Sequence, residues 1–269
     1  MTRTLPANAA RFSGFADVYD HDRPAVPVVV ADILTQLAKV TRLTLVVDLA
    51  CGTGLSTRLW AGRADKVIGI EPNPDMRRQA VKTTKALKLS GITYQDGTST
   101  DTSLPDGCAD IVTCCQALHW MEPKATFAEI ARILRPGGVF AACDARHPPA
   151  MMWEAMKAFE TFHKEANRAA KVHGILPVEK WPKEAHLKSM KASKQFRFVT
   201  KLAVHGEEYG DGERLMGLAK SSSIVPALVK LGLTQGQIGL AQLQETAKRV
   251  LGAKREPWYF TYIVRVGVK

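Results

Sequence analysis

Short apolar segments alternate with helical segments through residues 26–145, and this alternation restricts the fold more than any other feature of the chain. Expected strands lie at 44–49, 66–70, 92–95, 109–115 and 139–143, and expected helices at 26–39, 56–60, 75–88 and 123–134. Several of these strands are apolar on both sides, so both of their faces have to be covered. That pattern is typical of a parallel sheet between two layers of helices.

The second half of the chain has a different pattern. Residues 151–172 have helical spacing, residues 173–193 are rich in Pro, Lys and His, and residues 196–205 are typical of a strand. A broken helix at 211–231, another helix at 235–251 and an apolar strand at 258–268 follow. The sequence therefore predicts one α/β core with a helical elaboration after the fifth strand.

Charge is distributed unevenly along the 269 residues, whose net charge is +11. Residues 1–145 contain 16 basic and 15 acidic side chains, whereas residues 146–269 contain 21 and 11. The basic half is either a solvated surface or an attraction for an anionic partner. Five cysteines without metal spacing, no apolar leader and no long apolar run favour a reduced cytoplasmic protein outside the membrane.

A tight turn rich in small residues follows the first expected strand, in the segment VVDLACGTG that ends at Gly54. Gly52 and Gly54 let the backbone come close to a ligand, and the next helix offers free N–H groups at its start. A dinucleotide site uses such a turn for a pyrophosphate, with the spacing G-x-G-x-x-G, but the sixth position here is Thr57. Asp48 precedes the turn, and its carboxylate would repel a pyrophosphate and attract a cationic amine. The turn therefore favours a ligand with an ammonium group.

Three further polar signals stand where later strands end. Glu71 closes the second strand, where an acid accepts hydrogen bonds from both hydroxyls of a ribose. Gly97-Thr98-Ser99 follows the third strand and suits the edge of an adenine ring, and CQALHW, residues 115–120, follows the fourth. Ligands of open parallel sheets bind at the carboxyl ends of the strands, so these signals together predict a binding site at that edge.

The segments DLACGTG, GIEPNPDM, DIVTCCQALHWM and ILRPGGVF resemble those of the class I S-adenosylmethionine-dependent methyltransferases, most closely the type 11 family. RFSGFADVYDHDRPAVP and QALHW are similar to the subgroup that includes trans-aconitate methyltransferase-like proteins. The resemblance implies a Rossmann-like α/β fold. Its seven-stranded sheet is mostly parallel with the last strand antiparallel, has helices on both faces, and carries a helical lid after strand five. The implied division is an S-adenosylmethionine-binding core at 1–145, a substrate lid with strand six at 146–256, and a terminal strand at 257–269 that returns to the core sheet.

The resemblance also implies S-adenosylmethionine as the cofactor and assigns residues to it. The turn residues would line the methionine moiety, Asp48 would orient the turn and approach the amino group, and Glu71 would hold the ribose. The remaining residues would flank the adenine, meet its polar edge, lie near the methionine end, or belong to an N-terminal segment that closes over the cofactor. The expected cofactor-binding residues are Tyr19, Arg23, Asp48, Ala50, Cys51, Gly52, Gly54, Glu71, Pro72, Met76, Thr98, Ser99 and Gln116. Two positions depart from the family pattern, because Ala50 replaces the usual first glycine and Thr100 replaces a common acid.

His119 and Trp120 are the candidate catalytic residues, as a base or as a pair that orients the acceptor. The alternative is a packing tryptophan beside a histidine that bonds to backbone, and the sequence leaves both open. Trp153, Met156 and Phe159 could line an acceptor pocket, but their helical spacing favours the core. No cluster of cysteines and histidines has metal-ligand spacing, so we expect no metal.

The leading functional hypothesis is methyl transfer to a small-molecule acceptor, O-directed, with a carboxylate or another anionic group among the candidates. A nucleic-acid or protein methyltransferase is the first alternative, motivated by the basic second half, although the chain lacks the Asn/Asp-Pro-Pro-aromatic element of exocyclic-amine methylation. The second alternative is a non-catalytic S-adenosylmethionine-binding regulatory protein. A dehydrogenase fits worst, because of Asp48 and Thr57.

Overall fold

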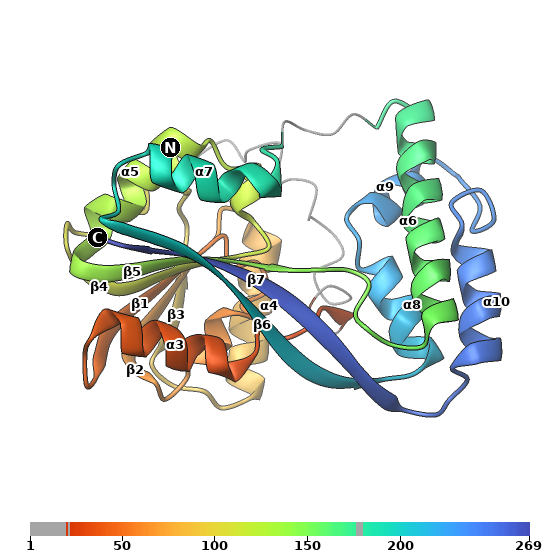
Figure 1. The fold of residues 1–269 in the computed structure, drawn as a ribbon, viewed down its shortest axis with the longest axis horizontal. Helices are drawn as coiled ribbons and strands as arrows, with labels where there is room; N and C mark the ends of the chain where they lie inside the picture. The colour runs from red at the N-terminus through yellow and green to blue at the C-terminus, as the bar shows by residue number, and fades with distance from the viewer. Residues whose placement is uncertain (1–19, 21, 176–179) are drawn as a thin grey trace.

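Seven strands form one sheet in the computed structural model, which describes residues 20, 22–175 and 180–269 (Figure 1). The strands lie in the order β3-β2-β1-β4-β5-β7-β6, and their bounds are β1 Leu43–Leu49, β2 Ala64–Ile70, β3 Ile92–Gln95, β4 Ala109–Cys115, β5 Leu134–Ala145, β6 Phe198–Gly210 and β7 Glu256–Val268. Strands β1 to β5 pair in parallel, whereas β7 is antiparallel to both of its neighbours, β5 and β6. The predicted Rossmann-like sheet with an antiparallel last strand is confirmed.

Helices cover both faces of the sheet, because successive side chains of its central strands point to opposite sides. Val46 packs in one buried cluster with Leu34 of α3 (Val28–Ala38). Its neighbour Val47 packs in a second cluster with Phe127 of α5 (Pro123–Ile133), on the face that also carries α7 (His186–Ala192). Figure 1 shows α3 on one side of the sheet and α5 and α7 on the other. This double burial explains why the strands are apolar throughout.

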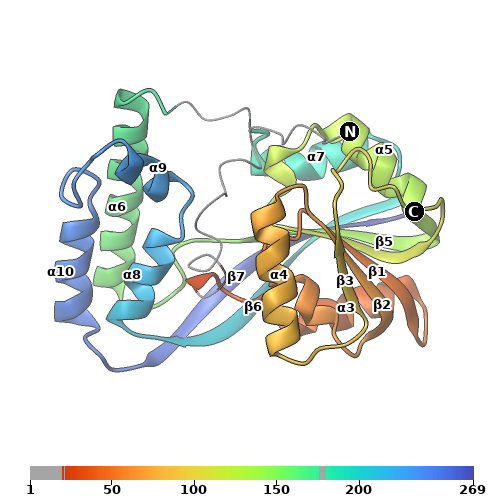
Figure 2. The same ribbon diagram turned by 180° about the vertical axis from the view of Figure 1, so that it is seen from behind.

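Four further helices form a separate group beyond the end of β5, and we call them the outer helices (Figures 1 and 2). They are α6 Trp153–Val172, α8 Gly212–Lys220, α9 Ile224–Lys230 and α10 Leu240–Val250. Long strands β6 and β7 reach from the sheet toward this group. Ser221-Ser222-Ser223 separates α8 from α9, as the broken helical pattern predicts.

The helix after β2 begins where its sequence predicts. The Asn73 side chain accepts hydrogen bonds from the N–H groups of Asp75, at 2.9 Å, and Met76, at 3.4 Å. Pro74 then opens α4 (Pro74–Ala86) at a position that needs no backbone donor. The predicted helix at 56–60 is instead the short 3-10 helix η1 (Thr57–Trp60), and β5 begins at Leu134, ahead of the predicted start at 139.

Candidate functional site

Asp48 anchors the turn that follows β1. Its side chain is fully buried, and its carboxylate accepts hydrogen bonds from the hydroxyls of Ser56, Thr57 and Thr113, each at 2.7 Å. Burial raises the pKa of Asp48, and the three hydroxyl hydrogen bonds oppose that rise. The threonine at the sixth position of the glycine pattern therefore has a role that glycine could not perform, since it binds the carboxylate that holds the turn.

The turn itself uses the left-handed backbone region at three positions. Ala50, Gly52 and Gly54 have φ values of 51°, 56° and 80°. A Cβ at Gly54 would collide with the hydroxyl of Tyr94, which packs beneath the turn. Gly54 is thus required by close packing as well as by its φ angle. Cys51 lies buried within the turn, and burial raises the pKa of its thiol, so the thiol is protonated at neutral pH.

Glu71 joins the end of β2 to this turn. One carboxylate oxygen accepts the N–H of Gly52 at 3.0 Å, and the other accepts the N–H of Asn73 at 2.9 Å. A carboxylate has about four acceptor positions, so two stay available for hydroxyl donors. Burial raises the pKa of Glu71, and its backbone hydrogen bonds oppose the rise. The glycine turn and Glu71, which are two separate signals in the sequence, are therefore joined by a hydrogen bond in the structure.

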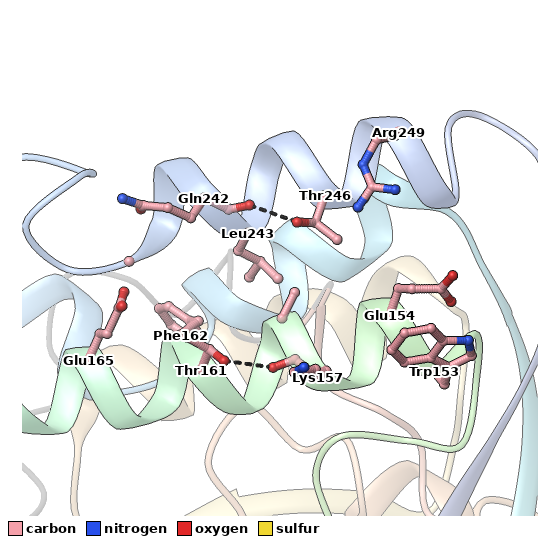
Figure 3. Close-up of a pocket in the computed structure, with 12 residues that line it drawn as sticks. Trp153, Glu154, Lys157, Thr161, Phe162, Glu165, Gln242, Leu243, Thr246 and Arg249 are labelled. Carbon is pink, nitrogen blue, oxygen red and sulfur yellow. Dashed lines mark hydrogen bonds between the residues drawn. The ribbon is translucent and has the colours of Figure 1, made fainter.

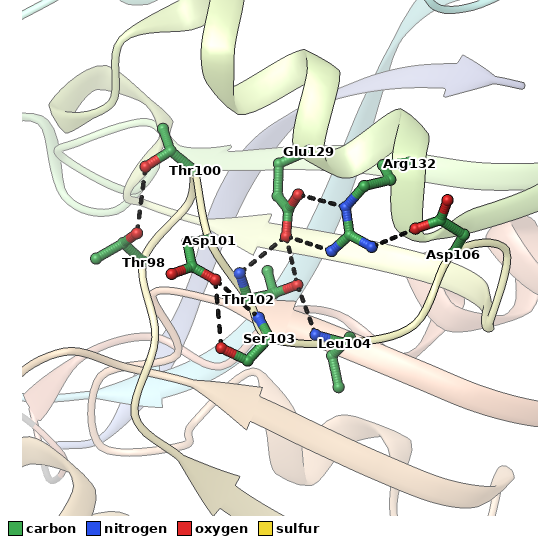
Figure 4. Close-up of polar contacts among 9 residues, drawn as sticks. All are labelled: Thr98, Thr100, Asp101, Thr102, Ser103, Leu104, Asp106, Glu129 and Arg132. Carbon is green, nitrogen blue, oxygen red and sulfur yellow. Dashed lines mark hydrogen bonds and ion pairs between the residues drawn. The ribbon is translucent and has the colours of Figure 1, made fainter.

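Small polar residues after β3 form the next part of this edge (Figure 4). The N–H of Thr98 donates to the carbonyl of Asp101 at 2.9 Å, and the hydroxyl of Ser99 accepts from that of Thr126 at 3.0 Å. The hydroxyl of exposed Thr100 bonds to that of Thr98 at 3.3 Å. These hydrogen bonds form the turn although position 100 is a threonine and not an acid.

Glu129 of α5 fixes the chain just after that turn, as Figure 4 shows. Its carboxylate accepts both the N–H and the hydroxyl of Thr102, at 2.8 and 2.6 Å. Arg132 donates to the same carboxylate and also pairs with Asp106. These hydrogen bonds, led by Arg132, lower the pKa of Glu129 to about 2. The sequence did not predict this buried acid, which lies within helix α5.

The candidate catalytic residues lie after β4, in the 3-10 helix η2 (Leu118–Trp120). The ring centroids of His119 and Trp120 are 4.8 Å apart, and the ammonium group of Lys180 lies 4.4 Å from the centre of the Trp120 ring. Burial, assisted by the charge of Lys183, lowers the pKa of His119 to about 3. His119 is therefore neutral at pH 7, and so weak a base is poorly matched to deprotonating an acceptor.

A charged cluster that the sequence did not reveal surrounds Asp144, near the end of β5. Lys183 lies 2.7 Å and Arg265 2.8 Å from its carboxylate oxygens. Lys183 also donates to the side-chain oxygen of Gln116 at 3.2 Å, which links the cluster to the expected methionine end. Burial would raise the pKa of Asp144, but Lys183 and Arg265 outweigh burial and lower it. His186 packs nearby, and burial lowers its pKa.

Asp20 contacts the glycine turn, and Arg23 contacts the outer helices. Asp20 accepts hydrogen bonds from Thr53 at 2.8 Å, Arg58 at 2.7 Å and Thr83 at 3.0 Å. Arg23 donates to the backbone carbonyl of Ser221 at 2.9 Å, between α8 and α9. Tyr19, the other expected residue of this segment, lies outside the described residues. Asp20 was not predicted, although it lies between Tyr19 and Arg23 in the sequence.

Aromatic residues of α6 divide between the core and a groove. Phe159 is buried, with 1% exposure, whereas Trp153 is 66% exposed. Trp153, Thr161, Glu165 and Arg249 are among the side chains that line a groove of about 350 Å³ between α6 and α10 (Figure 3). Helical spacing correctly predicted the core for Phe159 and wrongly for Trp153.

The glycine turn anchored by Asp48 lies at the carboxyl edge of this sheet, and residues 47–142 match the family model of a methyltransferase domain. The chain therefore contains a methyltransferase domain. Among the described residues, no group of three or more potential ligands could hold a metal ion, and no helix is long and apolar enough to cross a membrane.

Named relatives agree with this assignment. An uncharacterized methyltransferase of Mycobacterium tuberculosis (strain ATCC 25618 / H37Rv) is 34% identical over 130 residues, which are 47% of this chain and 49% of that protein. A probable S-adenosylmethionine-dependent methyltransferase of Saccharomyces cerevisiae is 32% identical over 125 residues, 46% of this chain and 43% of that protein. The chain thus spans about half the length of the curated relatives it matches.

A solved structure extends the likeness in fold to most of the chain. The provisionally named type II methyltransferase from Anaeromyxobacter dehalogenans has a TM-score of 0.64 and 23% identity. The match covers 91% of this chain and 97% of that one, so the likeness in fold extends beyond residues 47–142.

Proposed function

We propose that this protein transfers the methyl group of S-adenosylmethionine to a small-molecule acceptor. The observation that carries the proposal is the connection between the glycine turn and Glu71, through the hydrogen bond from Gly52. The turn offers close backbone approach for an amino acid moiety, and Glu71 keeps two acceptor positions for ribose hydroxyls. Asp48 acts through the turn, because three hydroxyls occupy most of its carboxylate.

Methyl transfer requires the residues of the site mainly to position the two reactants. Bound S-adenosylmethionine supplies a methyl group on a sulfonium, which an acceptor lone pair displaces while the electrons of the C–S bond pass to a neutral thioether. The protein's task is then to align the acceptor and exclude water. Neutral His119 is a weak base, so the site suits an acceptor that arrives without a proton to lose. A carboxylate is such an acceptor, and this favours O-methylation.

The charges at the carboxyl edge favour the same acceptor. Asp144 faces two cations, Lys183 and Arg265, while His119 and His186 are neutral near pH 7. Among the described residues, this cluster therefore holds one more positive than negative charge. A surplus cation in a partly buried site attracts an anion. The resemblance to the trans-aconitate methyltransferase-like subgroup also implies an acidic acceptor.

The competing functions are less well supported. The net charge of +10 in residues 146–269 motivates a nucleic-acid or protein acceptor, but Asp144 of the first half pairs with Arg265 and offsets part of it. A regulatory protein without catalytic activity would bind the cofactor through the same contacts. Only a measurement of methyl transfer distinguishes it from an enzyme.

Titration calorimetry with S-adenosylmethionine and with NAD tests the cofactor. We expect binding of the first alone, and Glu71→Gln should weaken it about 10- to 100-fold, since it removes a charged acceptor. Glu160→Gln, at an exposed position of α6, is the matched control and should leave affinity unchanged. Binding of NAD in place of S-adenosylmethionine would refute the proposal. Labelled methyl transfer to benzoate, succinate and citrate, with their amides as controls, then tests the acceptor class.

A further inference from the structure

His147 lies two residues beyond the end of β5, where the sheet meets α6. Its ring centroid is 6.4 Å from that of Phe159 on α6 and 6.3 Å from that of Phe260 on β7. Neither ring nitrogen is accessible to solvent, and neither makes a hydrogen bond to any residue that the structure describes. Because a neutral imidazole always carries one donor and one acceptor, both of these groups lack partners in an apolar surrounding.

Two cations and a second imidazole act electrostatically on this ring. Arg23, Lys183 and the imidazole of His163 are the titratable groups near it, and they act with burial to lower the pKa of His147 to about 3. His163 of α6 lies against Phe159, at 4.7 Å between ring centroids, and burial together with Arg23 also lowers its pKa. Both imidazoles are therefore neutral at pH 7. The positive charge comes from Arg23, on the segment that precedes α3, and from Lys183, beside Gln116.

We propose that His147 binds the methyl acceptor by donating a ring N–H to an acceptor carboxylate, in the field of Arg23 and Lys183. The inference rests on the proposed function and adds to it a residue that selects the acceptor. A carboxylate would satisfy the unpaired ring donor and lie among cations, whereas an ammonium group would be repelled. Arg23 bonds to Ser221 between two of the outer helices, and Lys183 bonds to Gln116 at the end of β4.

The first test observes the histidine directly. Protein with ¹⁵N-labelled histidine is saturated with S-adenosylhomocysteine and titrated with benzoate, succinate and citrate, and with their amides as neutral controls. We expect at least one carboxylate, and no amide, to shift the ring resonances of His147, assigned through their loss in His147→Phe. If S-adenosylhomocysteine binds but no carboxylate moves these resonances, this inference is overturned while the cofactor assignment stands. If S-adenosylhomocysteine does not bind, the proposed function itself fails.

The second test uses whichever carboxylate is methylated. His147→Phe should raise the KM for that acceptor about 10- to 100-fold, the effect of losing a charged hydrogen bond, and leave the Kd for S-adenosylmethionine unchanged. His147→Asn retains a donor and should recover part of the loss. His173→Asn, at an exposed position after α6, is the control and should change neither constant. An unchanged acceptor KM in folded His147→Phe would overturn the inference.

Discussion

Replacement of Ala50 by glycine should stabilise the protein. Its φ of 51° places an alanine in the left-handed region, at the first position of the turn that carries the cofactor contacts in our proposal. A side chain costs about 1–2 kcal/mol there, because Cβ crowds the following carbonyl. Ala50→Gly removes that strain.

Two smaller effects oppose the gain. Glycine increases the conformational entropy of the unfolded chain, which costs about 0.4–1 kcal/mol. Ala50 is half-buried against the cluster beneath α5, so removal of its methyl group costs up to about 0.4 kcal/mol. The net change in the free energy of unfolding is a gain of about 0.5 kcal/mol, or about 1–2 °C in Tm.

A matched substitution should give the opposite sign. Ala169 is also half-buried but lies in the regular helix α6, so Ala169→Gly should lose about 1 kcal/mol. Lys88, exposed at a φ of 53°, provides a second left-handed site, and Lys88→Gly should not be destabilising. Urea denaturation of the three variants should place Ala50→Gly about 1.5 kcal/mol above Ala169→Gly. An equal loss at both alanines would show that the backbone argument is wrong.

Three further changes test other parts of the structure. Asp20→Ala should cost about 3 kcal/mol in urea denaturation, because it leaves the largely buried guanidinium of Arg58 without its carboxylate; a loss below 1 kcal/mol would contradict this. The pKa of His147 is about 3 in the folded protein and about 6.5 in the unfolded chain. The contribution of its neutral form to the stability of the folded protein is therefore fully present above pH 6.5 and is lost as the pH falls toward 3. Between pH 7 and pH 5 the wild type should therefore lose about 2 kcal/mol more than His147→Phe, and parallel denaturation profiles would count against the assignment. Lys183→Met should raise the KM for a carboxylate acceptor about tenfold with Kd for S-adenosylmethionine unchanged, while exposed Lys188→Met should alter neither.

Local signals predicted much of the fold and of the cofactor side of the site. The strand at 44–49 and the helix that begins near residue 75 both depend on neighbouring residues, and the structure contains both as β1 and α4. Propensity failed at residues 56–60, because Thr57 is drawn to Asp48 and the segment closes as a single 3-10 turn.

The acceptor side depends on contacts between distant segments, and the sequence could not predict it. Asp144, Lys183 and Arg265 come from β5, from the segment before α7 and from β7, and no spacing connects them. The orphaned ring of His147 is likewise visible only once α6 and β7 pack around it. By contrast, Trp153 matched a core pattern but lies at the end of α6 beside a groove.

The unequal pairing of β7 has a mechanical consequence. Tyr262–Val268 lies between β5 and β6, whereas residues 256–261 pair with β6 and are joined on their other side only by the bridge between Tyr259 and Ala150 and the hydrogen bond from Arg146 to Thr261. These ends of β6 and β7 therefore extend beyond the other strands of the sheet as a ribbon, with α8 following β6 directly and α10 leading into β7. Two-stranded ribbons tolerate a wider range of twist than broad sheets. Because β6 continues into α8 and α10 continues into β7, a change in the twist of this ribbon would move both helices together.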